Sequence, residues 1–191
     1  MATKQDQLNS LHLRMESDRS LPLVGESNLV FGEGSPDASV MFIGEAPGRF
    51  EDKERRPFVG RAGKLLDVLL SEVKWPRESV YITNIVKRRP PANRDPLPEE
   101  IAFYEPYLRR QIQIVRPQVI ATLGRFSMNY FLPEAKISRD HGTIFISKGV
   151  CVYPLYHPAA ALRSTGVLND LRKDFRRLPK VLQKALTTHA D

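Results

Sequence analysis

The chain has 191 residues and a formal net charge of +7, and it contains a single cysteine. The length suffices for one domain with a substantial core, and one cysteine excludes an intramolecular disulfide, a cysteine-based zinc site and an iron–sulfur cluster held by cysteines. No segment has the continuous apolar length of a membrane span, and the basic excess favours a polyanionic partner such as nucleic acid.

Residues 1–16 are polar and mixed in charge, without the apolar core of a signal peptide. We expect them to form an N-terminal extension that is either poorly ordered or helical. After this extension, short apolar runs that end at turn residues predict buried strands. These runs are 28–31, 39–44, 80–83, 118–123 and 150–155.

Apolar residues recur at helical spacing between these strands. The pattern predicts helices over 65–73, 98–116 and 168–182, and Pro106 and Pro179 are expected to bend or interrupt the second and the third. Strands that alternate with helices indicate a parallel sheet with helices on both faces. We therefore predict a single α/β domain over 1–191, a three-layer α/β/α sandwich with a short central parallel sheet.

The residues that follow the predicted strands point to a site, because ligands of such sheets bind at the carboxyl ends of the strands. They include Glu45, Phe58, Asn84 and His157. An aromatic ring can stack on a nucleobase, a carboxamide can match the pairing edge of uracil, an imidazole can stabilise a departing base, and a carboxylate can orient water. Each residue alone has an ordinary structural explanation; together they indicate a site for a flat polar ring.

Several sequence blocks carry a family resemblance. They are VFGEG at 30–34, GEAPG at 44–48, RPFVGRAGKLLD at 56–67, YITNIVK at 81–87 leading into RPP at 89–91, and HPAA at 157–160. In this order, from about Ser17 to about Leu182, the chain resembles the family 4 uracil-DNA glycosylases. The resemblance implies a uracil-DNA glycosylase-like fold and hydrolysis of the N-glycosidic bond of deoxyuridine in DNA by base flipping, which leaves an abasic site for base-excision repair.

The resemblance also implies roles for single residues. Glu45 positions or activates the attacking water, and His157 stabilises charge on the leaving base. Phe58 stacks on uracil and Asn84 reads its pairing edge, with Gly44 and Ala46 beside them. The surrounding loops are expected to contact DNA through Gly48, Arg61, Lys64, Lys87, Arg89, Pro158, Ala161, Leu162 and Arg163. For the basic cluster at 172–177, DNA contact and a solvated helix face both stay open.

One departure from the family concerns metal. The family usually holds an iron–sulfur cluster on four cysteines, and the matching positions here are Ser17, Ser20, Arg88 and either Phe103 or Tyr104. Cys151 matches none of them. Because such clusters are ligated by thiolates, we expect no cluster, no metal and no other cofactor. We expect other contacts to take over the structural role of the cluster. These are apolar packing by Phe103 and Tyr104 and polar bonds from Arg88, Ser17 and Ser20.

A second departure concerns the residue that fills the gap left by the flipped base. Many family members carry a bulky aliphatic residue at the fifth position counted from the motif histidine, where this chain has Ala161. A methyl group fills such a gap poorly. Either Leu162 or Arg163 fills it, or the enzyme prefers single-stranded DNA.

The expected partner is uracil-containing DNA, single- or double-stranded, bound by a monomer in a prokaryote-like cytoplasm, where DNA binding places it at the nucleoid. One alternative is a glycosylase with specificity for another deaminated or mismatched base. A second is a non-catalytic relative that binds damaged DNA, although the joint presence of Glu45, Asn84 and His157 argues against it. A nucleotide-binding loop at 32–34 is disfavoured because its spacing does not match a phosphate-binding motif.

Overall fold

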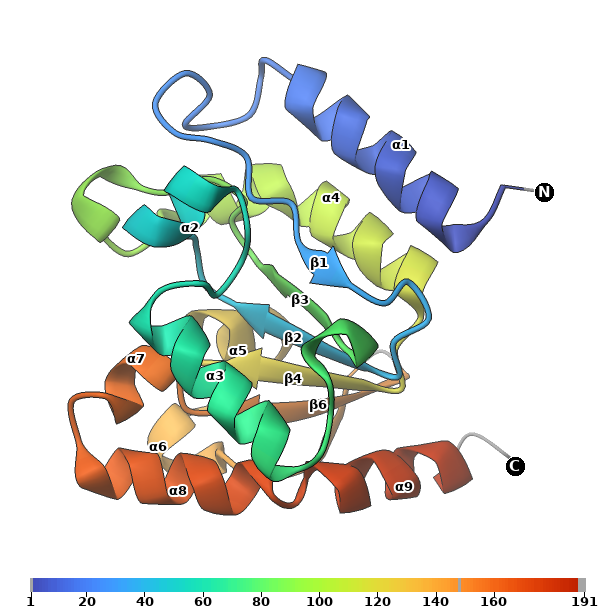
Figure 1. Ribbon diagram of the computed structural model, residues 1–191, viewed down its shortest axis with the longest axis vertical. Helices are drawn as coiled ribbons and strands as arrows, with labels where there is room; N and C mark the ends of the chain where they lie inside the picture. Colours follow the sequence, from blue (N-terminus) through green and yellow to red (C-terminus); the bar gives the residue numbers. More distant parts are fainter. Residues whose placement is uncertain (1, 148, 189–191) are drawn as a thin grey trace.

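The computed structural model describes residues 2–147 and 149–188. Within these residues, six strands form one sheet in the order β1-β3-β2-β4-β6-β5 (Figure 1). The central strands are parallel: β2 (Val40–Gly44), β3 (Tyr81–Asn84), β4 (Val119–Leu123) and β6 (Val150–Leu155). The edge strands β1 (Glu33–Gly34) and β5 (Phe145–Ser147) are antiparallel to their neighbours. The predicted parallel sheet is therefore confirmed at its centre and is mixed at its edges.

Helices cover both faces of the sheet, which confirms the predicted three-layer sandwich (Figure 1). Side chains of a strand point alternately to its two faces, so Phe42 of β2 enters one core and its neighbour Ile43 the other. The first core is closed by α3 (Arg61–Glu72), α8 (Thr165–Phe175) and α9 (Leu178–Thr188). The second core is closed by α1 (Lys4–Ser17) and α4 (Pro98–Val115).

Short helices occupy the connections. They are α2 (Arg49–Glu54), α5 (Arg125–Phe131), α6 (Ile137–Asp140) and α7 (Pro158–Ala161), with single 3₁₀ turns at Arg77–Ser79 and Pro91–Asn93. Both α2 and α7 follow directly from carboxyl ends of central strands, so they frame the predicted site. None of the helices in the described ranges is long and apolar enough to span a membrane.

The N-terminal extension is helical from Lys4 onward, and Met1 lies outside the described residues. Thr3 caps α1 with a reciprocal bond to Asp6, and Leu8, Leu11 and Met15 are buried in the core shared with α4. The α1 helix is therefore fixed to the rest of the chain by apolar packing along its length. This is one of the two alternatives that the sequence left open for 1–16.

The two prolines behave differently. Pro179 is the second residue of α9, and the predicted helix over 168–182 is two helices separated at Arg176 and Arg177. Of the bend or interruption predicted at Pro106, the interruption is wrong, because α4 continues from Pro98 to Val115 through that residue. Pro106 lies on the exposed side of α4, where water can bind the backbone carbonyl that its missing N–H leaves free.

The strand predicted over 28–31 is wrong, and the edge strand β5 was not predicted. The segment is buried at Leu29, Val30 and Phe31. However, the Phe31 carbonyl accepts hydrogen bonds from side chains, whereas in a strand it would accept a backbone N–H of the neighbouring strand. The Thr83 hydroxyl donates to that oxygen over 2.8 Å, and the Gln111 amide donates over 2.9 Å. Apolar character alone cannot distinguish such a buried extended segment from a strand.

Candidate active site

The polar residues predicted at the strand ends converge on one edge of the sheet. The chain passes from β2 to β3 on one side and then to β4 on the other side of β2, so a crevice opens at the carboxyl ends of the strands. Gly44 and Asn84 are aligned in register, and Gly124 and His157 follow β4 and β6. A cavity of about 630 Å³ lies here. Of the predicted site residues it is lined by Glu45, Ala46, Gly48, Phe58, Asn84, His157 and Arg163.

Phe58 and Asn84 lie against the backbone of Gly44. A Cβ atom at Gly44 would be 2.5 Å from Phe58 Cζ and 2.4 Å from Asn84 Oδ1, so any larger residue there would displace both. Asn84 Oδ1 is buried and accepts no hydrogen bond from any residue that the structure describes. A buried acceptor without a partner is costly, and Asn84 lines the cavity. The cavity therefore presents an acceptor for an N–H group of a ligand beside an aromatic ring.

His157 presents one fixed nitrogen to the cavity. It is the N-cap of α7, and its Nδ1 accepts the backbone N–H of Ala159 over 3.0 Å, so the neutral ring carries its proton on Nε2. Burial lowers the pKa of His157 to about 4, although the nearby charge of Glu51 raises it. The imidazole is therefore a neutral donor at physiological pH. Its ring centroid is 5.7 Å from that of Phe58.

Glu45 is the acid–base candidate of the cavity. Burial is the main cause that raises its pKa to about 7, the charge of Asp95 adds to the rise, and Arg125 opposes it. Asp95 and Arg125 form an ion pair of 2.7 Å at the rim, joining the loop after β3 to α5. The backbone carbonyl of Glu45 accepts the N–H of Val86 over 3.0 Å, which fixes the loop. A carboxylate with such a pKa suits general base catalysis near neutral pH.

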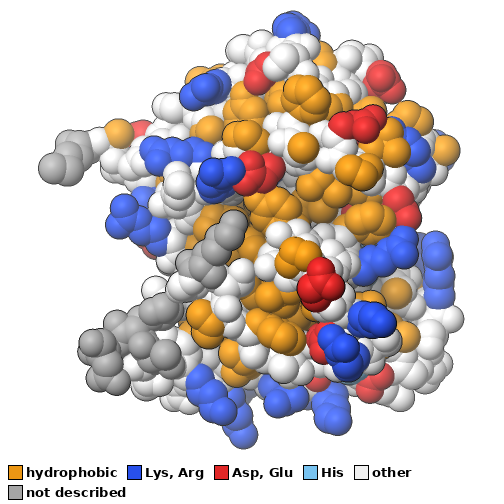
Figure 2. All heavy atoms as spheres, turned by 180° about the vertical axis from the view of Figure 1, so that it is seen from behind, with side chains coloured by type: hydrophobic (Ala, Val, Ile, Leu, Met, Phe, Trp, Pro, Cys, Tyr) orange, Lys and Arg blue, Asp and Glu red, His pale blue; other side chains and the backbone are white. Residues whose placement is uncertain are grey.

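Not all predicted DNA-contact residues line the cavity. Arg61 and Lys64 are exposed on the first turn of α3, while Arg89 is half-buried and bonded to Asn93. Leu162 is exposed and follows α7, and Pro158 is buried at the start of that helix. Two members of the basic cluster at 172–177, Arg172 and Arg176, both form ion pairs with Glu72. On the face opposite to that of Figure 1, acidic side chains lie among the basic ones (Figure 2).

Two predicted DNA contacts are wrong because the side chains are internal. Lys87 is fully buried, and its Nζ donates to Thr83 Oγ1, to the Asn84 carbonyl and to Gln111 Oε1, each over 2.6 Å. Burial lowers its pKa well below the usual value. Ala161 is 3% exposed and packs in the core beneath α7, so its side chain is not available to DNA. The two residues expected to fill the gap are both exposed, Leu162 by 42% and Arg163 beside it.

The loop 88–94 was expected to contact DNA, and its residues Asn93 and Arg94 line the cavity. Sequence reasoning missed Glu51, Asp95 and Arg125, which also line it. Arg125 follows β4 after a single glycine, so the same strand-end rule could have found it. Glu51 lies on α2 and Asp95 on the loop after β3, and no local sequence pattern predicted where these two segments would lie.

The positions that correspond to the cluster cysteines of the family do not fit an iron–sulfur cluster. They carry hydroxyl, guanidinium and aromatic groups where thiolates are required, and Cys151 is buried on β6. Ser17 donates to the Leu13 carbonyl within its own helix. Nowhere in the described ranges do three or more His, Cys, Asp or Glu residues gather as metal ligands.

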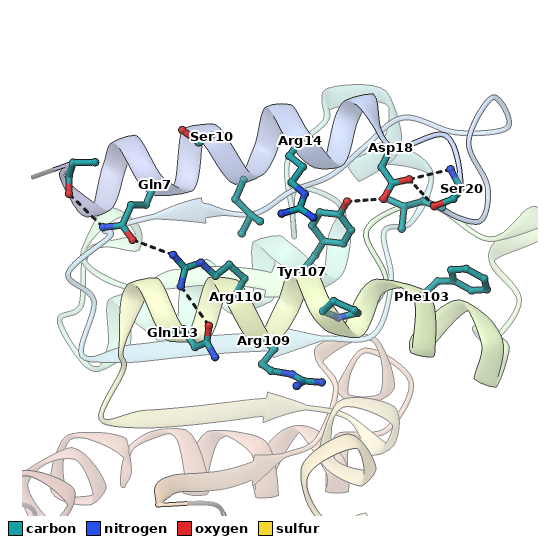
Figure 3. A pocket seen from close by; sticks show the side chains of 14 residues that line it. Gln7, Ser10, Arg14, Asp18, Ser20, Phe103, Tyr107, Arg109, Arg110 and Gln113 are labelled. Atoms are coloured by element: carbon teal, nitrogen blue, oxygen red, sulfur yellow. Dashed lines mark hydrogen bonds between the residues drawn. The ribbon is translucent and has the colours of Figure 1, made fainter.

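Polar bonds connect the loop after α1 with α4 and with the loop after β3 in this region. Tyr104 is buried and donates to the Pro22 carbonyl over 2.6 Å, and Arg88 donates to the Ser27 carbonyl. Beside them, Asp18 accepts bonds from Ser20 and from the Tyr107 hydroxyl, on the wall of a groove of about 800 Å³ between α1 and α4 (Figure 3). Phe103 is 51% exposed on the same groove, so the packing role expected for it is not seen.

The chain is similar over most of its length to proteins of one known family. A family model described as the uracil DNA glycosylase superfamily matches residues 31–183. The chain is 46% identical over 162 residues to the Type-4 uracil-DNA glycosylase of Sulfurisphaera tokodaii, covering 80% of this chain and 74% of that protein. It is 42% identical over 175 residues to the Type-4 enzyme of Archaeoglobus fulgidus, covering 87% and 88% of the two chains. The Type-4 enzyme of Thermotoga maritima is 41% identical over 178 residues, with 91% of each chain covered.

Proposed function

This chain belongs to the uracil-DNA glycosylase superfamily, and from that premise we propose that it excises uracil from DNA with the residues gathered in the cavity. The reaction is hydrolysis of the N-glycosidic bond of deoxyuridine, which leaves an abasic site and begins base-excision repair. The observation that carries this assignment to the cavity is the unpartnered Asn84 Oδ1 beside the ring of Phe58. Because this acceptor is buried, a ligand that donates to it gains affinity that other ligands lack.

Uracil matches this pair of side chains. Its N3–H donates to Asn84 Oδ1, the Asn84 amide donates to O4, and Phe58 supports the face of the ring. Cytosine presents an amino donor in place of O4 and an unprotonated N3, so with the Asn84 amide in this orientation both bonds are lost and the amide is left unsatisfied. Sites built on such bonds reject the wrong ligand strongly. A base inside a duplex cannot reach the cavity, so the nucleotide is flipped out.

The chemistry divides between Glu45 and His157. As the C1′–N1 bond breaks, its electron pair goes to the uracil ring, and His157 donates Nε2–H to the oxygen O2 where negative charge develops. Glu45 takes the proton of the water whose oxygen bonds to C1′ of the oxocarbenium-like sugar. The neutral imidazole of His157 suits this task because it already carries the Nε2–H that donates, so the ring need not be protonated first.

DNA binding is assigned to residues around the cavity mouth. Leu162 fills the space left by the flipped base, and Arg163 contacts the strand beside it. Arg61, Lys64 and Arg89 bind phosphates without reading sequence. We further propose that the protein acts as a monomer on single- or double-stranded DNA at the nucleoid of a prokaryote-like cell.

The function is tested by incubating the protein with a labelled oligonucleotide that contains one uracil and then cleaving abasic sites with hot alkali. Parallel substrates carry hypoxanthine, or thymine opposite guanine. Strand cleavage at uracil alone supports the assignment. Faster cleavage at another base means a shifted specificity, and DNA binding without any cleavage means a non-catalytic damage-binding protein.

Replacing Leu162 is expected to weaken activity on duplex DNA selectively. The side chain is needed only where a flipped base leaves a gap in a stack, so we expect Leu162→Ala to slow excision from a duplex by about tenfold and to change excision from single strands little. Leu186 is 49% exposed on α9, away from the cavity, so Leu186→Ala is the matched control. Equal losses on both substrates would show that Leu162 does not fill the gap.

The two charges of the ion pair at the rim are expected to shift the pH dependence of the excision rate by changing the pKa of Glu45. The rate falls as the pH decreases through about 7, because Glu45 must be ionised to act as base. The charge of Asp95 raises this pKa and that of Arg125 lowers it. We therefore expect Asp95→Asn to move the acid limb of the pH–rate profile to lower pH, and Arg125→Gln to higher pH. Shifts in the same direction in both variants would contradict this coupling.

A further inference from the structure

One carboxylate in the cavity wall is assigned no contact with the base, the sugar or the water in the reaction above. Glu51, on α2, accepts three backbone N–H groups from two different loops. Its Oε2 accepts the N–H of Gly48 over 3.2 Å, and its Oε1 accepts those of Val59 over 2.9 Å and Gly60 over 2.7 Å. The first belongs to the GEAPG loop that carries Glu45, and the other two to the turn that presents Phe58.

The turn that Glu51 holds has an unfavourable backbone. Phe58 has φ of 51°, a left-handed conformation that a bulky side chain rarely adopts and that surrounding contacts must enforce. Packing on the α3 side is tight, since a Cβ at Gly63 would be 1.8 Å from the Phe58 carbonyl oxygen. On the other side, Arg77 donates to the Pro57 carbonyl over 2.5 Å and pairs with Glu33 and Asp67. Glu51 supplies the bonds immediately after Phe58.

Helix capping explains only one of the three bonds. The bond from the Gly48 N–H to Glu51 is one half of a capping box at the start of α2, which is a local feature of a six-residue helix; Gly48 has no side chain to make the reciprocal bond. The bonds from Val59 and Gly60 cross eight and nine residues to another loop and lie next to the aromatic ring. A cap alone would not require them.

We propose that Glu51 is a positioning residue that locks the loop of the water-activating carboxylate to the turn of Phe58, so that the ring is held ready to stack on the flipped uracil. The inference rests on the proposed function of the cavity. Three charge-assisted bonds to one carboxylate are stronger than neutral ones, and they fix two active-site loops relative to each other before the substrate arrives. Glu51 acts on uracil through Phe58.

The test compares two DNA ligands that differ in the base. One oligonucleotide contains 2′-fluoro-2′-deoxyuridine, which is hydrolysed slowly because the fluorine disfavours the cationic sugar; the other contains a tetrahydrofuran abasic analogue. Their affinity ratio reports the base contacts alone. Stacking on an aromatic residue is worth about 1–3 kcal/mol, so we expect Phe58→Ala and Glu51→Ala each to reduce the ratio by about fivefold or more. The double variant should lose no more than Phe58→Ala.

Two further variants keep the test decisive. Glu54→Ala removes a carboxylate of the same helix that does not line the cavity, and it should leave the ratio unchanged. Glu51→Gln keeps an acceptor for Val59 and Gly60 but places an amide N–H group against Gly48. It should therefore fold and show an intermediate ratio.

The outcomes separate the inference from the proposed function. If Phe58→Ala leaves the ratio unchanged, the stacking role in the proposed function is wrong. If Phe58→Ala reduces the ratio and Glu51→Ala and Glu51→Gln do not, the positioning role is overturned. Equal losses of affinity for both ligands in the Glu51 variants would also overturn it, because they would indicate general destabilisation.

Discussion

Replacing Glu45 by Gln is expected to slow uracil excision by about 10²–10³-fold in single turnovers at neutral pH, because a positioned general base contributes a factor of that size. Gln has nearly the same shape, so the cavity keeps its walls while the group that accepts a proton from water is lost. Burial and Asp95 raise the pKa of Glu45 to about 7, so the acid limb of the wild-type profile belongs to this residue. That limb should be absent from the profile of Glu45→Gln.

Binding measurements distinguish lost chemistry from a lost site. Affinity for the 2′-fluoro-deoxyuridine oligonucleotide should stay within about twofold of wild type in Glu45→Gln, because Asn84 and Phe58 make the contacts to the base. Glu54→Gln serves as the matched control, since it removes the same charge from α2 outside the cavity. An acid limb that persists near pH 7 in Glu45→Gln would assign the titration to another group and remove Glu45 from the role of base.

The convergence of the site could be predicted because it depends on topology rather than on side-chain detail. Glu45, Asn84 and His157 each follow a central parallel strand, and parallel strands bring their carboxyl ends to one edge. The alternation of strands and helices was equally visible in the sequence, because continuous apolar runs mark strands that are buried on both faces.

Burial of charged and small residues could not be predicted in the same way. Lys87 lies in a basic run, and a lysine in such a run is ordinarily exposed. It is internal here because Thr83, the Asn84 carbonyl and Gln111 supply three acceptors, two of them near in sequence and one on α4. Only the packing of α4 on the sheet brings Gln111 to this place, and no local pattern reports it.

The same limit applies to Ala161 and to the segment 28–31. Counting from His157 located Ala161 at the position where many family members carry a bulky residue, but it could not show that α7 turns Ala161 inward and leaves Leu162 outside. The segment 28–31 has the composition of a strand, while its carbonyl at Phe31 is satisfied by side chains of β3 and α4. In both cases the deciding contact comes from an element distant in sequence.

Replacing His157 by Asn is expected to lower the single-turnover rate by about 10²–10³-fold, the effect of removing one donor from a developing oxyanion. Asn is chosen because His157 also caps α7 by accepting the N–H of Ala159. An Asn side chain can keep that acceptor while it loses the Nε2–H donor that faces the cavity. His157→Ala loses both functions, so a lower melting temperature in His157→Ala than in His157→Asn would separate the cap from the chemistry.

The pH dependence decides which form of His157 acts. Burial lowers its pKa to about 4, so the neutral ring is the donor throughout the neutral range. In Glu45→Gln, where the limb near pH 7 is absent, the residual rate should therefore stay flat between about pH 5.5 and 8. A residual rate that decreases as the pH rises through 6 to 7 would mean that an imidazolium stabilises the leaving base, and the neutral-donor mechanism would have to be abandoned.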